Sequence, residues 1–264
     1  MKKILLPGLL FFCGMAFGQM STVTPIGAGV GHATVAMQSP VALFSNQAGL
    51  TNLTKFAVVA AAEQRFLLSE LQSVAIGAAL PTRSGSFGLV VQSFGYEEFR
   101  QQKIGLSYAR KLWSALSVGA QFDFFQTRIP EYGSRGTLTF EAGMQADVSK
   151  TVRVGAHVFS PAQVELAEGE NLPTIFRLGV AWQVSDKLMV VSELEKDIEM
   201  PFRWKNGLSY QPVKTVSIRS GYASEPSMLF LGLGFAFGNG LQADMAGSFH
   251  QSLGFSPSAG VTWY

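Results

Sequence analysis

Long segments in which apolar and polar residues alternate constrain this chain more than any other feature. In residues 137–148, Leu138, Phe140 and Met144 share one parity, and Glu141 and Asp147 share the other. A period of two places successive side chains on opposite faces of an extended strand. About fourteen such segments follow residue 56, near residues 56–66, 70–80, 85–94, 100–110, 113–126, 136–148, 151–160, 174–184, 187–197, 201–211, 213–222, 228–237, 240–249 and 253–264.

The length of these segments is typical of strands that cross a membrane. Each has roughly 10 to 13 residues, whereas strands of soluble proteins have about 5 to 6. An even number of antiparallel strands can close into a barrel, and closure matters because each unpaired backbone group in hydrocarbon costs several kcal/mol. We therefore predict an all-β fold, a transmembrane antiparallel β-barrel of about 14 strands over residues 56–264.

A soluble β-sandwich or small-molecule barrel shows the same alternation and is the alternative. Only 14% of the residues are charged, against roughly 25% in soluble domains. Trp113, Trp182, Trp204 and Trp263 fall on the apolar parity near segment ends, as the aromatic girdles of membrane barrels require. Both observations favour the membrane barrel.

The breaks between segments predict two different ends of the barrel. Short polar breaks at residues 149–150, 185–186 and 238–240 suit tight hairpins and are expected at the periplasmic end. Longer connections, at residues 129–135 and 160–173, are expected outside the cell.

Residues 1–19 have the pattern of a cleaved signal peptide. Lys2 and Lys3 precede the apolar run 4–12, and Ala16 and Gly18 provide a small-x-small cleavage site. An N-terminal membrane anchor is the alternative, but this apolar run is much shorter than the ~20 residues that span a bilayer. Together with the barrel, the pattern predicts the outer membrane of a Gram-negative bacterium.

Residues 20–55 differ in composition from the barrel segments. They contain no Asp, Glu, Arg or Lys before Lys55. Ser39 followed by Pro40 is a helix-start signal, and Gly49 is a natural stop. We expect a plug or hatch segment with a short helix, tucked into the lumen; a periplasmic arm is the alternative.

The polar parity of the second half of the chain carries both signs of charge. If segments 187–197 and 201–211 pair, the acidic face of one lies beside the basic face of the other. The charges could form a constriction that selects what passes, or a network that fills the lumen and satisfies itself; we favour the network because both signs occur on adjacent strands. The predicted members of this lumen charge network are Arg153, Arg177, Glu193, Glu195, Arg203, Lys205, Arg219 and Asp244.

Several classes of function are disfavoured. A net charge of +2 is too small for a nucleic-acid binder that neutralises phosphates. The three histidines, His32, His157 and His250, lie far apart and form no triad spacing, and the one cysteine, Cys13, lies in the predicted signal peptide. We therefore predict that the chain is not an enzyme and has no catalytic residue, metal site or cofactor.

The residues before the barrel resemble a known family. Residues 29–36 and 39–50 are similar to the N-terminal signature of FadL-like outer-membrane barrels, in particular the PorV/PorQ group. Gln47 departs from that signature, which usually has proline at this position. The matching plug motif consists of Phe44, Asn46, Gln47, Ala48, Gly49 and Leu50.

The resemblance implies two roles, besides contact with outer-membrane lipid. The first is an accessory component of protein export, of the type IX secretion kind, whose partners would be a translocon barrel or exported proteins. The alternative is a FadL-like passive channel whose ligand would be a hydrophobic small molecule. The channel requires a path through the lumen, an apolar pocket and a lateral gap.

Overall fold

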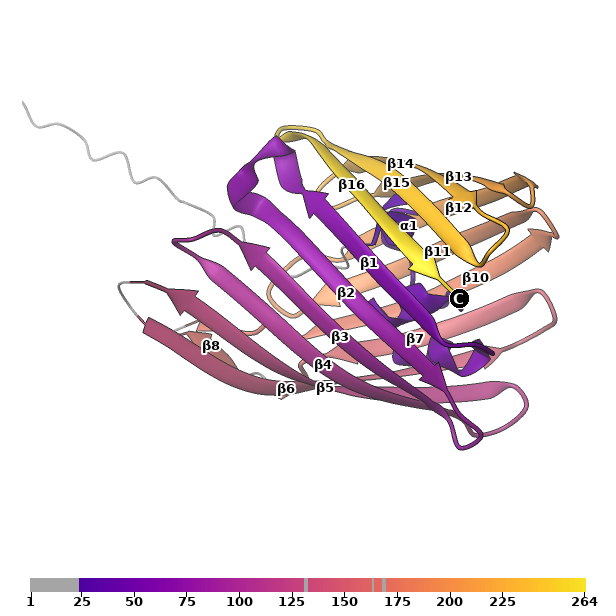
Figure 1. Cartoon of the computed structure of the whole chain (residues 1–264), viewed down its shortest axis with the longest axis horizontal. Coiled ribbons are helices and arrows are strands. Elements are labelled where there is room, and N and C mark those ends of the chain that lie inside the picture. Colours follow the sequence, from indigo (N-terminus) through magenta and orange to yellow (C-terminus); the bar gives the residue numbers. More distant parts are fainter. Residues whose placement is uncertain (1–23, 131–132, 163, 168–169) are drawn as a thin grey trace, which may run out of the picture.

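The structure, a computed structural model, describes residues 24–130, 133–162, 164–167 and 170–264. Fourteen strands form one closed barrel in which every strand pairs antiparallel with its neighbours and the first strand pairs with the last (Figure 1). The fold class predicted from the alternation is therefore confirmed. The predicted signal peptide lies outside the described residues.

The barrel strands coincide closely with the alternating segments, and a separate small hairpin lies between the seventh and eighth of them. The hairpin consists of β8 (Glu165–Ala167) and β9 (Glu170–Asn171). The barrel strands are β1 (Ala57–Gln64), β2 (Gln72–Pro81), β3 (Ser86–Gly95), β4 (Arg100–Lys111), β5 (Leu116–Ile129), β6 (Gly133–Asp147), β7 (Val152–Phe159), β10 (Ile175–Ser185), β11 (Leu188–Asp197), β12 (Arg203–Val213), β13 (Val216–Ala223), β14 (Met228–Ala236), β15 (Leu241–His250) and β16 (Gly254–Trp263).

The outer face of the barrel is apolar along its whole circumference. Large side chains such as Leu106, Phe122 and Leu178 are 61–71% exposed there. Trp113 and Trp263 lie at the end of the barrel where the chain terminates, and Trp204 lies toward the opposite end. An apolar band with aromatic residues near both rims is the surface of a membrane barrel.

Within the described residues, no helix has the length and apolar character needed to cross a bilayer.

The two ends of the barrel differ in their connections. The terminal end, which carries the C-terminus, has tight turns such as residues 186–187 and 214–215. The loop end, opposite to it, carries the 160–174 connection with its small hairpin and two short 3₁₀ turns, η3 (Arg65–Leu67) and η4 (Ser69–Leu71). This division agrees with the predicted placement of short and long breaks.

The expected long connection at residues 129–135 is wrong. There β5 and β6 continue their ladder to the pair Ile129 and Gly133, and Arg128 pairs with Ser134. Polar residues and glycines suggested a loop, but beyond the hydrocarbon both faces of a strand can contact water, so the alternation that marks a membrane strand is not required there.

The N-terminal segment, residues 24–56, enters the barrel and then leads into β1. It contains α1 (Pro25–Gly29) and two 3₁₀ helices, η1 (Pro40–Phe44) and η2 (Gln47–Asn52). Residues 24–50 are almost all buried. The wall and this segment together form most of the core, and Leu172 of the 160–174 connection packs against Phe125 of β5.

A side chain caps the start of each of these three helices. Thr24, Ser39 and Asn46 accept hydrogen bonds from the backbone amides of Gly27, Val41 and Ala48. The predicted helix does begin at Pro40 but ends at Phe44, short of Gly49. Asn46 is extended and starts a second turn, which divides the expected helix in two.

Candidate functional site

A ring of inward-facing glycines surrounds the N-terminal segment. At each of these positions a Cβ atom would lie less than 3.0 Å from atoms of the segment, a distance that real Cβ atoms essentially never show. Nine strands contribute one glycine each. This glycine ring consists of Gly77, Gly88, Gly119, Gly143, Gly155, Gly179, Gly207, Gly221 and Gly232. The lumen is therefore wide enough for the segment only because these residues lack side chains.

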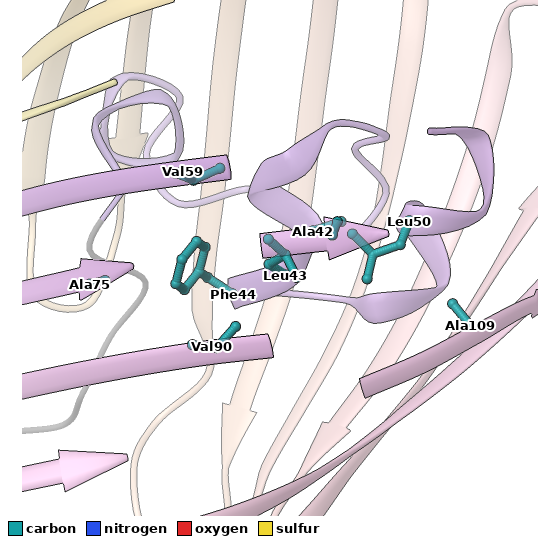
Figure 2. Close-up of a cluster of buried hydrophobic side chains, with 9 residues drawn as sticks. Ala42, Leu43, Phe44, Leu50, Val59, Ala75, Val90 and Ala109 are labelled. Carbon is teal, nitrogen blue, oxygen red and sulfur yellow. The ribbon is translucent and has the colours of Figure 1, made fainter. Parts of the chain in front are cut away.

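Two residues of the predicted plug motif anchor an apolar cluster on the wall. Phe44 and Leu50 pack with Leu43 against small side chains of the first four strands (Figure 2). Those wall residues are Val59, Ala75, Ala79, Val90 and Ala109. Leu43 and Leu50 are fully buried, so this cluster fills the lumen beside β1 to β4.

The polar members of the motif connect the segment to the opposite wall. The Asn46 amide nitrogen lies 2.7 Å from the Val35 carbonyl oxygen, and 3.2 and 3.3 Å from the carbonyl oxygens of Met144 and Ala156. Gln47 donates to Glu141 (3.1 Å). These bonds satisfy backbone and side-chain groups that are buried away from water.

The two remaining motif residues are small and tightly packed. Ala48 is fully buried and its backbone amide donates to the Asn46 side chain. A Cβ atom at Gly49 would lie 2.6 Å from the Met37 carbonyl oxygen within the segment itself. Larger residues would separate the turn of η2 from the chain beside it.

Wall side chains also bind the backbone of the segment directly. Glu193 accepts a hydrogen bond from the Val35 amide (2.9 Å). Gln145 donates to the carbonyl oxygens of Val35 (2.9 Å) and Met37 (3.0 Å). The wall thus supplies hydrogen-bond partners for buried backbone groups that are not paired within a helix.

A first group of buried charges lies on β4 to β7. The Lys103 ammonium is 2.8 Å from a Glu141 oxygen and 3.5 Å from an Asp123 oxygen. The Nε2 atom of His157 is 3.0 Å from the second Glu141 oxygen. Because Gln47 also contacts Glu141, this group, the Lys103 cluster, joins the wall to the N-terminal segment.

A second group, the Glu195 network, lies on β10 to β12. One Glu195 oxygen is 2.9 Å from Nε of Arg177 and 2.5 Å from Nζ of Lys205, and Lys205 also contacts Glu193 (3.1 Å). Arg203 approaches Glu195 only to 3.9 Å. The register of β11 and β12 places Glu193 opposite Lys205 and Glu195 opposite Arg203, the cross-strand arrangement expected from their alternation.

The other three predicted network residues lie elsewhere in the lumen. Arg219 and Asp244 form a buried pair (2.7 Å) across Gly234, on the strand between them. Arg153 pairs with Asp147 (2.7 Å) and is partly exposed near the terminal end. The eight predicted charges therefore divide into three separate groups rather than one network.

A cavity of about 590 Å³, here called the vestibule, occupies the loop end of the lumen. Its lining includes His32, Arg65, Arg203, Phe66, Met228 and Phe230. His32 belongs to the N-terminal segment, and its desolvation, followed by the charges of Lys205 and Arg203, holds its pKa well below the ordinary value. His32 is therefore neutral at physiological pH and its aromatic ring packs edge-on against Phe230.

Sequence reasoning missed the Lys103 cluster and the glycine ring. Lys103 and Asp123 share the inward parity of the segments in which they stand, so parity alone identifies them as lumen residues. The glycines share that parity as well. Their common height in the barrel is set by the register between strands, which the sequence of a single segment does not contain.

No protein-family model matches the sequence, and no curated protein matches it. Solved structures of membrane channels are similar to it over nearly their whole length. The toluene transporter TbuX of Ralstonia pickettii matches with a TM-score of 0.68 and 14% identity over 92% of this chain and 97% of that one. The toluene transporter TodX of Pseudomonas putida matches with a TM-score of 0.68 and 11% identity, covering 92% and 96%.

A FadL homologue of Pseudomonas aeruginosa is also similar, with a TM-score of 0.59 and 13% identity over 92% of this chain and 96% of that one. The fold is therefore that of a FadL-like barrel. Identities this low establish the fold alone. Nothing in these comparisons supports the PorV/PorQ assignment.

Proposed function

We propose that this chain is an outer-membrane channel of a Gram-negative bacterium that admits small hydrophobic molecules. The N-terminal segment acts as its plug, and passage requires the plug to move. The similarity of the fold to that of toluene transporters supports this proposal. The apolar outer face, with aromatic residues at both rims, supports a location in a membrane.

The observation that carries the proposal is the fit between the plug and the glycine ring. Each of nine strands has a glycine, and therefore no side chain, where the segment crosses the lumen. A wall shaped in this way holds the segment in one position without a covalent bond. A barrel that served only as a membrane-embedded scaffold could fill its lumen with wall side chains instead.

The path we propose runs along the lumen. All neighbouring strands are paired around the closed barrel, so the described residues contain no lateral gap of the kind expected for a channel. The vestibule provides an entry from the loop end, and the plug separates it from the terminal end.

Uptake of radiolabelled toluene by Gram-negative cells that carry the protein in their outer membrane tests the proposal. A disulfide between cysteines at positions 51 and 117 would lock η2 to the wall, since Thr51 Oγ1 and Ser117 Oγ lie 2.8 Å apart. Cys13, the only native cysteine, lies in the predicted signal peptide, so Thr51→Cys and Ser117→Cys supply the only two cysteines outside it. We expect the oxidised variant to block uptake and a reductant to restore it.

Each single-cysteine variant is the matched control and should take up toluene in both redox states. Equal uptake by the oxidised double variant and its controls would contradict movement of the plug. Uptake no faster than in cells that lack the protein, together with co-purification of a translocon barrel from gently solubilised membranes, would favour the export role instead.

A further inference from the structure

The Glu195 network contains one more cation than carboxylate. Its cations are Arg177, Arg203 and Lys205, and its carboxylates are Glu193 and Glu195. Glu193 is engaged by Lys205 and by the plug backbone, and one Glu195 oxygen is shared by Arg177 and Lys205. One positive charge is left without a matched partner.

Arg203 carries that charge at the wall of the vestibule. Its nearest carboxylate oxygen, on Glu195, is 3.9 Å away, beyond hydrogen-bond distance. Its one hydrogen bond within the described residues is a weak contact of 3.6 Å to the Met228 sulfur, and its buried Nε has no partner there. A guanidinium has five N–H donors, so most of the Arg203 donors have no acceptor among the described residues.

The other charged groups that line the vestibule do not compensate Arg203. Arg65 and Glu63 contact each other at 3.6 Å. Glu225 is exposed on the turn between β13 and β14, and His32 is neutral. At Arg203 the vestibule therefore presents a guanidinium without a hydrogen-bonded carboxylate to a solute that enters from the loop end.

The rest of the lining suits a compact apolar body. Phe66, Met228 and Phe230 line the cavity beside Arg203, together with Met200 and Leu253. The plug closes its floor, where Val30 is fully buried against the glycine ring. The cavity of about 590 Å³ accommodates a single aromatic ring beside these side chains while the plug stays in place.

We propose that the vestibule binds small aromatic carboxylates, with the carboxylate on Arg203 and the aromatic ring among Phe66, Met228 and Phe230. A carboxylate matches the planar fork of a guanidinium and forms charge-assisted hydrogen bonds with it. This inference deepens the proposed function, because it assigns a preferred substrate class to the same lumen.

Isothermal titration calorimetry on the detergent-solubilised full chain tests this inference, with benzoate, the neutral benzyl alcohol and palmitate as probes. We expect benzoate to bind at least about tenfold more tightly than benzyl alcohol. Arg203→Gln should remove that preference, and Arg203→Lys should restore part of it because it keeps the charge but not the fork. Arg153→Gln, an inward arginine outside the vestibule, should leave benzoate affinity unchanged.

A second variant tests the charge imbalance without removing Arg203. Glu195→Gln removes the carboxylate that competes with the ligand, so benzoate should bind more tightly than it does to the native chain. Benzoate affinity that is unchanged in both Arg203→Gln and Glu195→Gln would overturn the inference. So would equal affinities for benzoate and benzyl alcohol, or tighter binding of palmitate than of benzoate.

Toluene uptake distinguishes failure of this inference from failure of the proposed function. Uptake through the native channel without a benzoate preference would overturn the vestibule site and leave the channel intact. Benzoate binding that depends on Arg203, without toluene uptake, would support the vestibule site and contradict the channel for neutral hydrocarbons.

Discussion

At the scale of single residues, the absence of a side chain is the property that decides how the lumen is filled. Glycines recur in the sequence at positions such as Gly179, Gly207 and Gly221, where the alternation would otherwise place an inward side chain. None of the nine ring glycines has a positive φ, so conformational freedom does not explain them. The close approach of the plug explains them instead.

Replacing one glycine of the ring by alanine should therefore loosen the plug. In Gly207→Ala the added methyl group would lie under 3.0 Å from Val30, and overpacking of this kind lowers stability by about 1–3 kcal/mol. The temperature at which the barrel loses its SDS-resistant migration should fall. Gly238→Ala is the matched control, because nothing lies within 4 Å of that Cβ position. Equal shifts for both variants would contradict this explanation.

At the scale of elements, the N-terminal segment depends on a few side chains that hold its irregular backbone. Asn46 is the clearest case, because it caps η2 and at the same time bonds to Val35 and to the wall. The sequence distinguishes this segment from the barrel strands by its lack of charge. It did not predict the break in the helix, because Asn46 acts through partners from β6 and β7 that are remote in sequence.

Asn46→Ala should detach the plug from the wall. Loss of the cap and of the buried hydrogen bonds is expected to cost about 1–3 kcal/mol. Limited proteolysis of the detergent-solubilised protein should then cleave the N-terminal segment faster than in the native chain. Asn52→Ala, at the exposed end of η2, is the control and should leave the cleavage rate unchanged. Similar rates for the two variants would refute a role for Asn46 as an anchor.

The β11–β12 hairpin makes a second prediction at this scale. Changing Glu193 and Glu195 together to glutamine leaves Lys205, which is buried, and the partly buried Arg177 and Arg203 without carboxylates, and breaking buried pairs costs about 3–5 kcal/mol. Heat resistance should therefore fall strongly, while toluene uptake by the intact barrel changes little. A large change in uptake at unchanged heat resistance would instead identify these charges as a selective constriction.

At the scale of the whole molecule, strand number, closure and the inside-outside division all follow from one repeated pattern. The pattern can be recognised in the sequence because lipid imposes the same two requirements on every strand. Its outward side chains must be apolar, and its backbone must form hydrogen bonds with the neighbouring strands. These requirements end at the rims, which is where the sequence misplaced the 129–135 connection. They also do not specify which inward residues meet, so the Lys103 cluster emerged only from the closed barrel.

The outward face should tolerate charge only near its edges. Leu106→Arg, in the middle of β4, is expected to lower the free energy of unfolding in lipid vesicles by about 2–4 kcal/mol. Leu112→Arg, on the same parity but at the terminal-end turn, should lower it by about 0–1 kcal/mol. Urea titrations of both variants measure the difference. Equal losses of unfolding free energy for the two variants would contradict the placement of Leu106 in the hydrocarbon and of Leu112 at its edge.

The pairing of β1 with β16 has a consequence for how the molecule is assembled. The plug precedes β1 in the chain, and the strand that closes the wall beside it is the last strand of the barrel. A segment of this bulk could not be threaded through a finished cylinder whose waist already fits it closely. The barrel strands must therefore close around the plug, and β1 pairs with β16 once the plug is in place.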